Sequence, residues 1–311
     1  DYLAKIADER QQIAAERSTK PKQKLSYLAF RSLKSTFHGY LTGKVDSSRV
    51  RKTLEDLAAT DDPRVLTLLK KVWEEDRGNL QSQVLGAMGT LGTNEALCLL
   101  LQNLQNTLPE VRLYAVQALG SSRDPRVVRA LMYFGQHEPD KLYAVSDSIL
   151  KIGNSALDPL IGLLGTTDRG LLQDTVLILG RLRSLSAVKP LLERLRYEQG
   201  SLRGGIATAL GLIGDPTSLP SLRPLLKDSD EKIRIQAAQA LSRVPHPSSL
   251  GHLIQALQDP NAEVRQRCAA ALGELGDCKA APALVALLSD ESQATRIAAA
   301  ESLGRPTCYK C

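Results

Sequence analysis

The sequence predicts an all-α solenoid, a right-handed superhelix of about eight helix pairs preceded by a non-repeat helical segment. Of the 311 residues, 43% are apolar but only 4% are aromatic, which suits thin layers of small helices better than one central core. An apolar marker residue also recurs near the end of every second predicted helix, in steps of 31 residues with one step of 29. The markers are Leu57, Met88, Leu119, Leu150, Leu179, Leu210, Leu241, Leu272 and Leu303.

Residues 1–45 precede the repeats and do not share their pattern. We expect helices over 2–18 and 25–42, with a break at the Lys-Pro-Lys-Gln-Lys stretch 20–24. Four aromatic residues are predicted to lie along one face of the second helix. We interpret the segment as a cap over the first repeat, with a docking helix for a partner as the alternative.

Positive charge is concentrated near the N-terminus. Residues 15–52 carry a net charge of +8, whereas the whole chain carries +6. The segment is therefore predicted to attach to an acidic protein or an anionic membrane surface, and its deletion is expected to lower partner affinity without unfolding the repeats. The predicted docking residues are Lys20, Lys22, Lys24, Tyr27, Phe30, Arg31, Lys34, Phe37 and Tyr40.

The repeat array is predicted over residues 46–304, with 305–311 as a C-terminal tail. Each unit has a helix A with leucines at helical spacing and a helix B with small residues before the marker. The glycine that often follows the marker, such as Gly211, is expected to end helix B. In the turn that follows, an Asp such as Asp215 is expected to cap the next helix.

Aspartates and arginines recur within the units. Asp228, Asp259 and Asp290 each stand six residues before an arginine, namely Arg234, Arg265 and Arg296. This spacing resembles the Asp and Arg ladder of HEAT repeats. The strings Ala-Leu-Gly-Glu-Leu-Gly-Asp (271–277) and Val-Arg-Gln-Arg-Cys-Ala-Ala-Ala-Leu (264–272) look most like the short repeats of the phycobilisome lyase type. We expect each aspartate to pair with the arginine six residues later, so that Arg265→Ala leaves Asp259 unpaired and destabilises the protein.

The resemblance covers roughly residues 46–304 and is specific for the fold rather than for the function. Proteins with such repeats include bilin lyases, phycobilisome-degradation factors, assembly scaffolds and a metal hydroxylase. We expect a non-catalytic scaffold without a cofactor that binds another protein. The alternative is a bilin lyase or phycobiliprotein chaperone subunit, an enzyme of light-harvesting antenna assembly that handles a bilin. A second alternative is nucleic-acid binding through the N-terminal basic segment, which the slightly acidic array disfavours.

The predicted binding surface is the concave face lined by helix B of each pair, centred on residues 112–174. Here the ladder positions hold His137 with Tyr143 and Thr166 with Leu172, and the 29-residue step occurs. Asp147 is placed at a small-residue packing position, where a carboxylate is costly unless it is paired or hydrated. A drift of the repeat with a rotated helix is the alternative to a pocket. The predicted partner-binding residues are Arg112, Tyr114, Tyr143, Asp147, Asp174 and Arg267.

Metal and catalytic sites are not predicted. Cys308 and Cys311 have metal-ligand spacing, and Cys278 makes a weak third candidate, but a structural zinc site requires four ligands. The odd number of cysteines favours reduced thiols. The sequence shows no signal peptide or membrane span, so we expect the cytoplasm or chloroplast stroma, including the periphery of a membrane. Because the chain starts at Asp1, a segment upstream of it is also expected.

Overall fold

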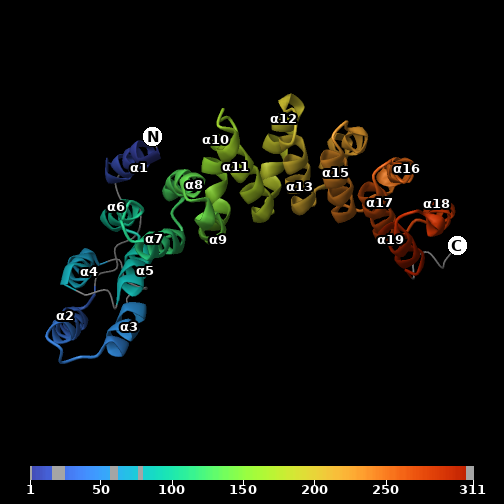
Figure 1. The fold of residues 1–311 in the computed structure, drawn as a ribbon. Helices are drawn as coiled ribbons and strands as arrows, with labels where there is room; N and C mark the ends of the chain where they lie inside the picture. Colours follow the sequence, from blue (N-terminus) through green and yellow to red (C-terminus); the bar gives the residue numbers. More distant parts are fainter. Residues whose placement is uncertain (1, 16–24, 57–61, 76–79, 306–311) are drawn as a thin grey trace. The chain divides into compact units, whose positions relative to one another are not determined.

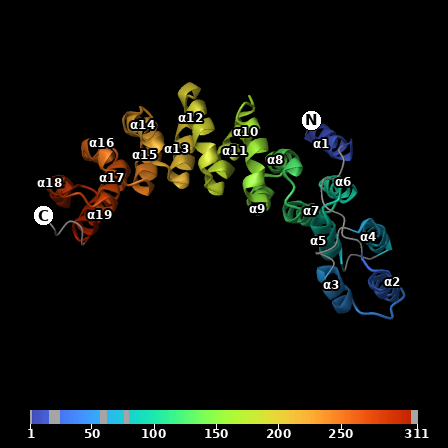
Figure 2. The ribbon, with the colours of Figure 1, turned by 180° about the vertical axis from the view of Figure 1, so that it is seen from behind.

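The computed structural model describes residues 2–15, 25–56, 62–75 and 80–305. All regular structure in these residues is helical, which confirms the predicted all-α class (Figure 1). The chain forms two compact units, Asp1–Gly162 and Leu163–Cys311, which we call unit 1 and unit 2. Each unit is a stack of helix pairs, and the second view shows the same order of pairs from behind (Figure 2).

In unit 1, helices A and B alternate along the chain, and the B helices α5, α7 and α9 pack against one another in sequence order. A separate helix, α1 (Tyr2–Ala15), precedes the pairs. The pairs are α2 (Tyr27–Leu41) with α3 (Ser47–Asp56), α4 (Pro63–Glu75) with α5 (Gln81–Leu91), α6 (Asn94–Asn103) with α7 (Pro109–Ser121), and α8 (Val128–His137) with α9 (Leu142–Ile152), followed by α10 (Leu157–Leu163).

Unit 2 repeats the arrangement, and its B helices again pack in sequence order. Its first B helix is α11 (Arg169–Leu182). The pairs that follow are α12 (Val188–Tyr197) with α13 (Leu202–Ile213), α14 (Leu219–Leu222) and the 3-10 helix η7 (Arg223–Lys227) with α15 (Glu231–Arg243), α16 (Leu250–Ala256) with α17 (Ala262–Leu275), and α18 (Ala281–Ala286) with α19 (Gln293–Leu303).

The turns between pairs follow the predicted chemistry. The Asp215 carboxylate accepts a hydrogen bond from the Thr217 backbone N–H at 2.8 Å, so this aspartate caps the short helix that leads into α14. Asp124 caps the equivalent turn before α8. The preceding B helices end on glycines in the left-handed conformation, which lacks a steric penalty only for glycine. These glycines are Gly92, Gly214 and Gly276.

The glycine after each marker has a different role from the one predicted. Gly89, Gly120, Gly180, Gly211 and Gly273 lie inside helix B, and none of them has a positive φ. Instead, each faces the next B helix at very short range: a Cβ added to Gly89 would lie 2.1 Å from the Ala118 carbonyl oxygen. The prediction that these glycines end the helix is therefore wrong. They remove a side chain where two backbones meet, and the glycine three positions later ends the helix.

The helix α1 does not stack in sequence order. It packs against α6 and α8, beyond the pairs that directly follow it in the chain (Figures 1 and 2). Ile6 and Ile13, seven residues apart and therefore on one helix face, are buried there. The Tyr2 ring stacks on His137 with 4.0 Å between ring centroids, and the Lys5 ammonium lies 4.7 Å from the centre of the Tyr133 ring.

The helices α2 and α3 form the first pair and pack against α4 and α5. Leu33 and Phe37 are buried in this contact. The buried Asp62 carboxylate joins the two pairs, because it accepts a hydrogen bond from the Leu25 backbone N–H at 3.0 Å and is bound by the Arg64 guanidinium. The bond from Arg64 lowers the pKa of Asp62 to about 2. The second predicted N-terminal helix is thus a working member of the stack.

Two glycines of α5 test the helix contact. We expect Gly89→Ala to destabilise the protein by about 1–3 kcal/mol, because its methyl group would overlap the α7 backbone. Gly86 has no heavy atom within 4 Å of an added Cβ, so Gly86→Ala should stabilise by about 0.5–1 kcal/mol through helix propensity. Urea denaturation midpoints measure both effects. Equal midpoints for the two variants would show that close approach of α5 and α7 is not a constraint.

Candidate functional site

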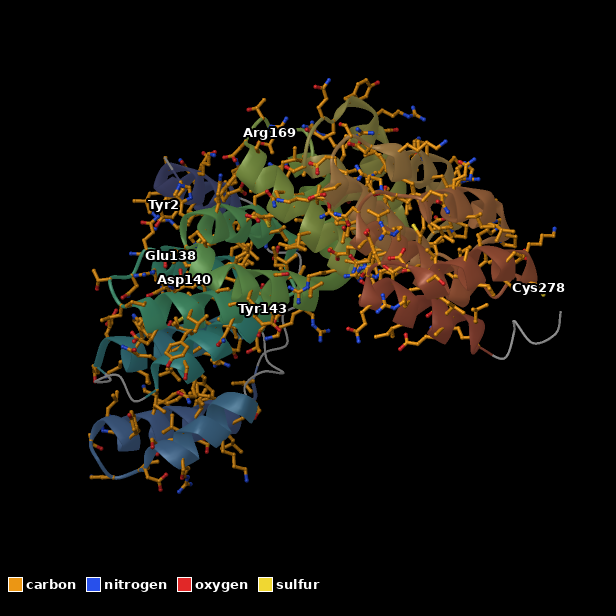
Figure 3. The ribbon with its side chains drawn as sticks, turned by 45° about the vertical axis from the view of Figure 1, so that its right-hand side comes forward. Tyr2, Glu138, Asp140, Tyr143, Arg169 and Cys278 are labelled. Atoms are coloured by element: carbon orange, nitrogen blue, oxygen red, sulfur yellow. The ribbon has the colours of Figure 1, made fainter. Side chains whose placement is uncertain are left out.

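The candidate site is the solvent-facing side of α7 and α9 in unit 1. We name it the α7–α9 face and define it by Tyr114, Gln117, Asp140, Tyr143 and Asp147. Tyr143 is 72% exposed, Gln117 and Asp140 are exposed, and Tyr114 and Asp147 are half-buried. Tyr143 and Asp147 lie four residues apart and therefore share one face of α9. Tyr143 projects near Glu138 and Asp140 at the start of this helix (Figure 3).

The register of α9 explains why Asp147 can stand on this face. A Cβ added to Gly120 would meet Ser148, just as one added to Gly89 would meet Ala118. Ser148 therefore corresponds to the residue before the marker, and the marker of α9 is Ile149 rather than Leu150. With this correction, the 29-residue step becomes part of two 30-residue steps. The small-residue packing position is filled by buried Ser146, and the prediction that Asp147 occupies it is wrong.

The predicted row of binding positions, five residues before each marker, lies at the border of the solvent-facing side. Val145 and Ala298 of this row are buried, and the other six residues are half-buried. The most exposed side chains stand one residue earlier on some helices, as Tyr143 does on α9 and Ile297 on α19. Half-buried members of the row are Gln83, Tyr114, Asp174, Gly205, Gln236 and Arg267.

Two predicted partner-binding residues lie in unit 2. Asp174 of α11 is half-buried, and its pKa is raised by burial and by the negative charge of Asp168. Arg267 of α17 forms an ion pair with Glu263, one turn earlier, at 3.2 Å. Neither residue belongs to the α7–α9 face, so their role in partner binding stays a prediction.

The arginine ladder links neighbouring repeats. Arg234 donates through Nε and Nη2 to the carboxylate of Asp259 at 2.7 and 3.0 Å, and through Nη1 to the backbone carbonyl of Asp228 at 3.0 Å. Arg265 binds the Asp290 carboxylate in the same bidentate way and also contacts Glu291. Each arginine thus holds the loop of its own repeat and the carboxylate of the next one.

This geometry corrects the predicted pairing. The aspartate six residues before each arginine offers its backbone carbonyl, and its carboxylate belongs to the preceding arginine. Asp259 is therefore bound by Arg234, so Arg265→Ala removes the partner of Asp290 instead. Arg203 starts this series by pairing with Asp228. Arg296 ends it, donating to the carbonyls of Asp290 and Glu291.

A modified rung of the ladder supports the start of α9. Arg112 donates to the Asn106 and Thr107 carbonyls and binds the carboxylate of Glu138 at 3.1 Å. Lys141 also binds Glu138, at 2.7 Å, and with Arg112 it lowers the pKa of this carboxyl. The expected ladder position, His137, is displaced by one residue in favour of Glu138. Arg112, predicted to bind a partner, is thus engaged within the protein.

The predicted N-terminal docking residues divide into three groups. Tyr27, Arg31 and Lys34 are exposed on α2. Phe30 is half-buried beneath the Arg64 guanidinium, 4.4 Å from the ring centre, and Tyr40 is half-buried. Phe37 is only 2% exposed, so its assignment to a docking surface is wrong. The remaining members, Lys20, Lys22 and Lys24, lie outside the described residues.

The cysteines show one departure from prediction. Cys278 is disulfide-bonded, so the expectation of a reduced thiol is wrong for this residue. Cys308 and Cys311 lie outside the described residues. Within the described part of the chain, no group of three or more His, Cys, Asp or Glu residues is arranged to hold a metal ion. No helix among the described residues is long and apolar enough to cross a membrane.

Comparison with known proteins identifies the repeat type. The family model for HEAT repeats matches residues 188–257 and 250–307. Among solved structures, Kap121p matches with a TM-score of 0.54 and 14% identity, over 97% of this chain and 41% of that chain. At such identity, the likeness shows the fold alone. No curated protein sequence matches this chain.

Two further solved structures have lower TM-scores. Human deoxyhypusine hydroxylase, solved with glycerol, matches at 0.35 and 19% identity, over 91% of this chain and 98% of that chain. The complex of CpcE and CpcF of phycocyanin lyase from Nostoc sp. PCC7120 matches at 0.39 and 19% identity, over 69% of this chain and 91% of that chain. These two likenesses carry no functional argument.

The ladder predicts a graded response to substitution. Arg265→Ala should destabilise the protein by about 1–3 kcal/mol, because the buried Asp290 carboxylate loses its bidentate partner. The matched variant Arg296→Ala should cost less, because Arg296 binds backbone carbonyls at the end of the ladder. Urea denaturation of both variants measures the difference.

The pH dependence gives a control for this prediction. Arg265 holds the pKa of Asp290 below its ordinary value, so the pair stabilises the fold above about pH 4 and loses this effect as the pH falls through the lowered pKa. The gap between wild type and Arg265→Ala should therefore narrow in acid. A gap that is constant from pH 7 to pH 2 would contradict a contribution from this ion pair.

Proposed function

We propose that this HEAT-repeat protein is a non-catalytic scaffold that binds another protein through the α7–α9 face. The exposed phenol ring of Tyr143 carries the proposal. Its side chain is 72% exposed on a helix whose neighbours hold it in a fixed place. Tyrosine is among the side chains that most often anchor protein interfaces, because it joins a large apolar ring to a hydroxyl group.

The support for Tyr143 is rigid. The helix α9 lies against Gly120 of α7 through Ser148, and its first turn is fixed by the contacts of Glu138 with Arg112 and Lys141. An anchor that is already held in place loses little conformational freedom when a partner binds. The face therefore offers a preorganised aromatic residue instead of a mobile loop.

The charge around Tyr143 defines the kind of partner. Asp140 and Asp147 flank the ring on α9 and its leading turn, and Glu110 is exposed at the start of α7. The Asp140 carboxylate is paired with Lys141 at 2.9 Å, which leaves the face mildly acidic. We infer a partner surface with a pocket for a phenol ring and a basic rim, since complementary charges favour association and orient it.

The exposed part of α2 supports a second attachment point for the same scaffold. Tyr27 and Leu28 are strongly exposed there, and Arg31 and Lys34 lie one turn further along the helix. The combination of apolar contact area and positive charge suits an acidic protein or an anionic membrane surface. The alternatives of bilin attachment and nucleic-acid binding have no comparable observation among the described residues.

The test compares wild-type and variant proteins as baits in cross-linked extracts of the source organism. We expect Tyr114→Ala combined with Tyr143→Ala to weaken capture of a stoichiometric partner at least about tenfold, equivalent to roughly 1.4 kcal/mol. The fold should persist, because Tyr143 is exposed and Tyr114 is half-buried. Binding constants are then measured with the purified partner.

Tyr197→Ala is the matched control, because Tyr197 is 85% exposed at the end of a helix A in unit 2. It should leave binding unchanged. Capture that is insensitive to the double substitution but is lost with Tyr197→Ala, or with a charge change at Arg31 and Lys34, would place the binding surface elsewhere and reject the α7–α9 face.

A further inference from the structure

A groove of about 380 Å³ lies in unit 2, between two successive A helices and away from the α7–α9 face. One wall is η7, which continues α14, and the other is α16. The ladder residues Asp228, Arg234 and Asp259 line one side of the groove. A volume of this size is at the lower end of the range of roughly 300–1,000 Å³ for small-molecule sites.

Two positive charges in the groove have no negative partner among the described residues. Arg223 is held in place by hydrogen bonds from Nε to the Leu219 carbonyl at 3.1 Å and from Nη1 to the Ser248 carbonyl at 3.0 Å. These neutral acceptors orient the guanidinium without compensating its charge. Lys227, one turn further along, is exposed and forms no recorded ion pair within the described ranges.

The acids of the groove are already engaged. Asp228 pairs with Arg203 of the preceding repeat, and Asp259 pairs with Arg234 at 2.7 Å. The ladder therefore contributes nearly no net charge, and the excess of about two positive charges comes from Arg223 and Lys227. Fixed charges of one sign in a hollow raise the local concentration of ions of the opposite sign.

The next groove along the chain shows that the repeat does not need these side chains. This groove offers hydrogen-bond donors from Arg223, Lys227, His252, Gln255 and Gln258. Their counterparts 31 residues later are Ile254, Gln258, Ala283, Ala286 and Ser289. Both positions belong to stacked helix pairs of the same kind, so five convergent donors are a property of this groove and not a requirement of the fold.

We propose that the groove between η7 and α16 binds a phosphomonoester group. A phosphate of this kind carries a charge of about −1.5 to −2 at neutral pH, which matches the two uncompensated cations. The planar guanidinium of Arg223 suits two oxygens of one phosphate, and Lys227 adds a mobile ammonium. The group is carried either by a phosphorylated side chain of a protein or by a small phosphorylated molecule, since both present the same oxyanion.

The experiment uses the full chain and four probes: O-phosphoserine, serine, glycerol 3-phosphate, and a short neutral peptide with one central phosphoserine. Binding is measured by calorimetry and by shifts of backbone amide resonances. We expect saturable binding of the phosphorylated probes, shifts confined to residues 223–228 and 252–260, and no response to serine. Tighter binding of the peptide assigns the group to a protein, and tighter binding of glycerol 3-phosphate assigns it to a small molecule.

The variants separate a specific site from general attraction. Arg223→Gln combined with Lys227→Gln should weaken binding at least about tenfold. Lys232→Gln combined with Arg243→Gln removes the same charge from exposed positions of α15 outside the groove, and it should change binding less than about twofold. Lys227→Gln alone guards against misfolding, because this side chain has no packing role, and it should weaken binding about threefold or more.

Two results would overturn the proposal. One is the absence of saturable binding by every phosphorylated probe at low salt. The other is equal weakening by the groove variant and the α15 variant, since this would reduce the interaction to screened attraction between net charges.

Discussion

Close contact between successive B helices is the constraint on which the rest of the structure depends. At Gly89, Gly120, Gly180, Gly211 and Gly273, a methyl group would overlap the next B helix. A single helix pair cannot bury both of its helices, and the neighbouring pair completes the core only if the backbones approach closely. The absence of a side chain at these positions permits this approach within each unit. The contact also orients each helix B, so the residues left facing solvent are determined by the same contact.

The arginine ladder acts at the edge of this stack and has a second consequence. Because each arginine binds the loop carbonyls of its own repeat and the carboxylate of the next, spacing and charge are satisfied together. The row of arginines in α13, α15 and α17 is therefore largely neutralised and does not form a basic surface. Against this background, a cation with only neutral partners stands out, as Arg223 does in the groove beside α16.

The repeat period predicted the helix pairs well, because the apolar spacing that it records is the spacing that packing requires. It could not assign the glycines, since a glycine that ends a helix and a glycine that meets a neighbouring backbone look alike in one dimension. The string Leu272-Gly273-Glu274-Leu275-Gly276 contains both kinds, three residues apart. The partner of each ladder arginine was hidden for a similar reason, because the correct aspartate lies 25 residues away and not six.

The candidate site was found at the right place for a partly wrong reason. Tyr143 and Asp147 stood out because they broke the repeat pattern, and Asp147 was assigned to the core because the unit around α9 was read one residue out of register. The contact between Gly120 and Ser148 reveals the shift, and this contact exists only between helices. Sequence reasoning identified an irregular repeat, whereas the packing decides which of its residues face solvent.

The irregularity at α8 and α9 has a second physical cause in α1. This helix was predicted from its own sequence, but Ile6 and Ile13 specify only that one face is apolar and not which helices cover it. The structure places that face on α6 and α8, with Tyr2 stacked on His137 and Lys5 over Tyr133. Residues that depart from the repeat on α8 thus contact the one described helix that stacks out of sequence order. The departure at His137 serves a contact within the chain, which leaves Tyr143, on the following helix B, as the exposed aromatic residue available to a partner.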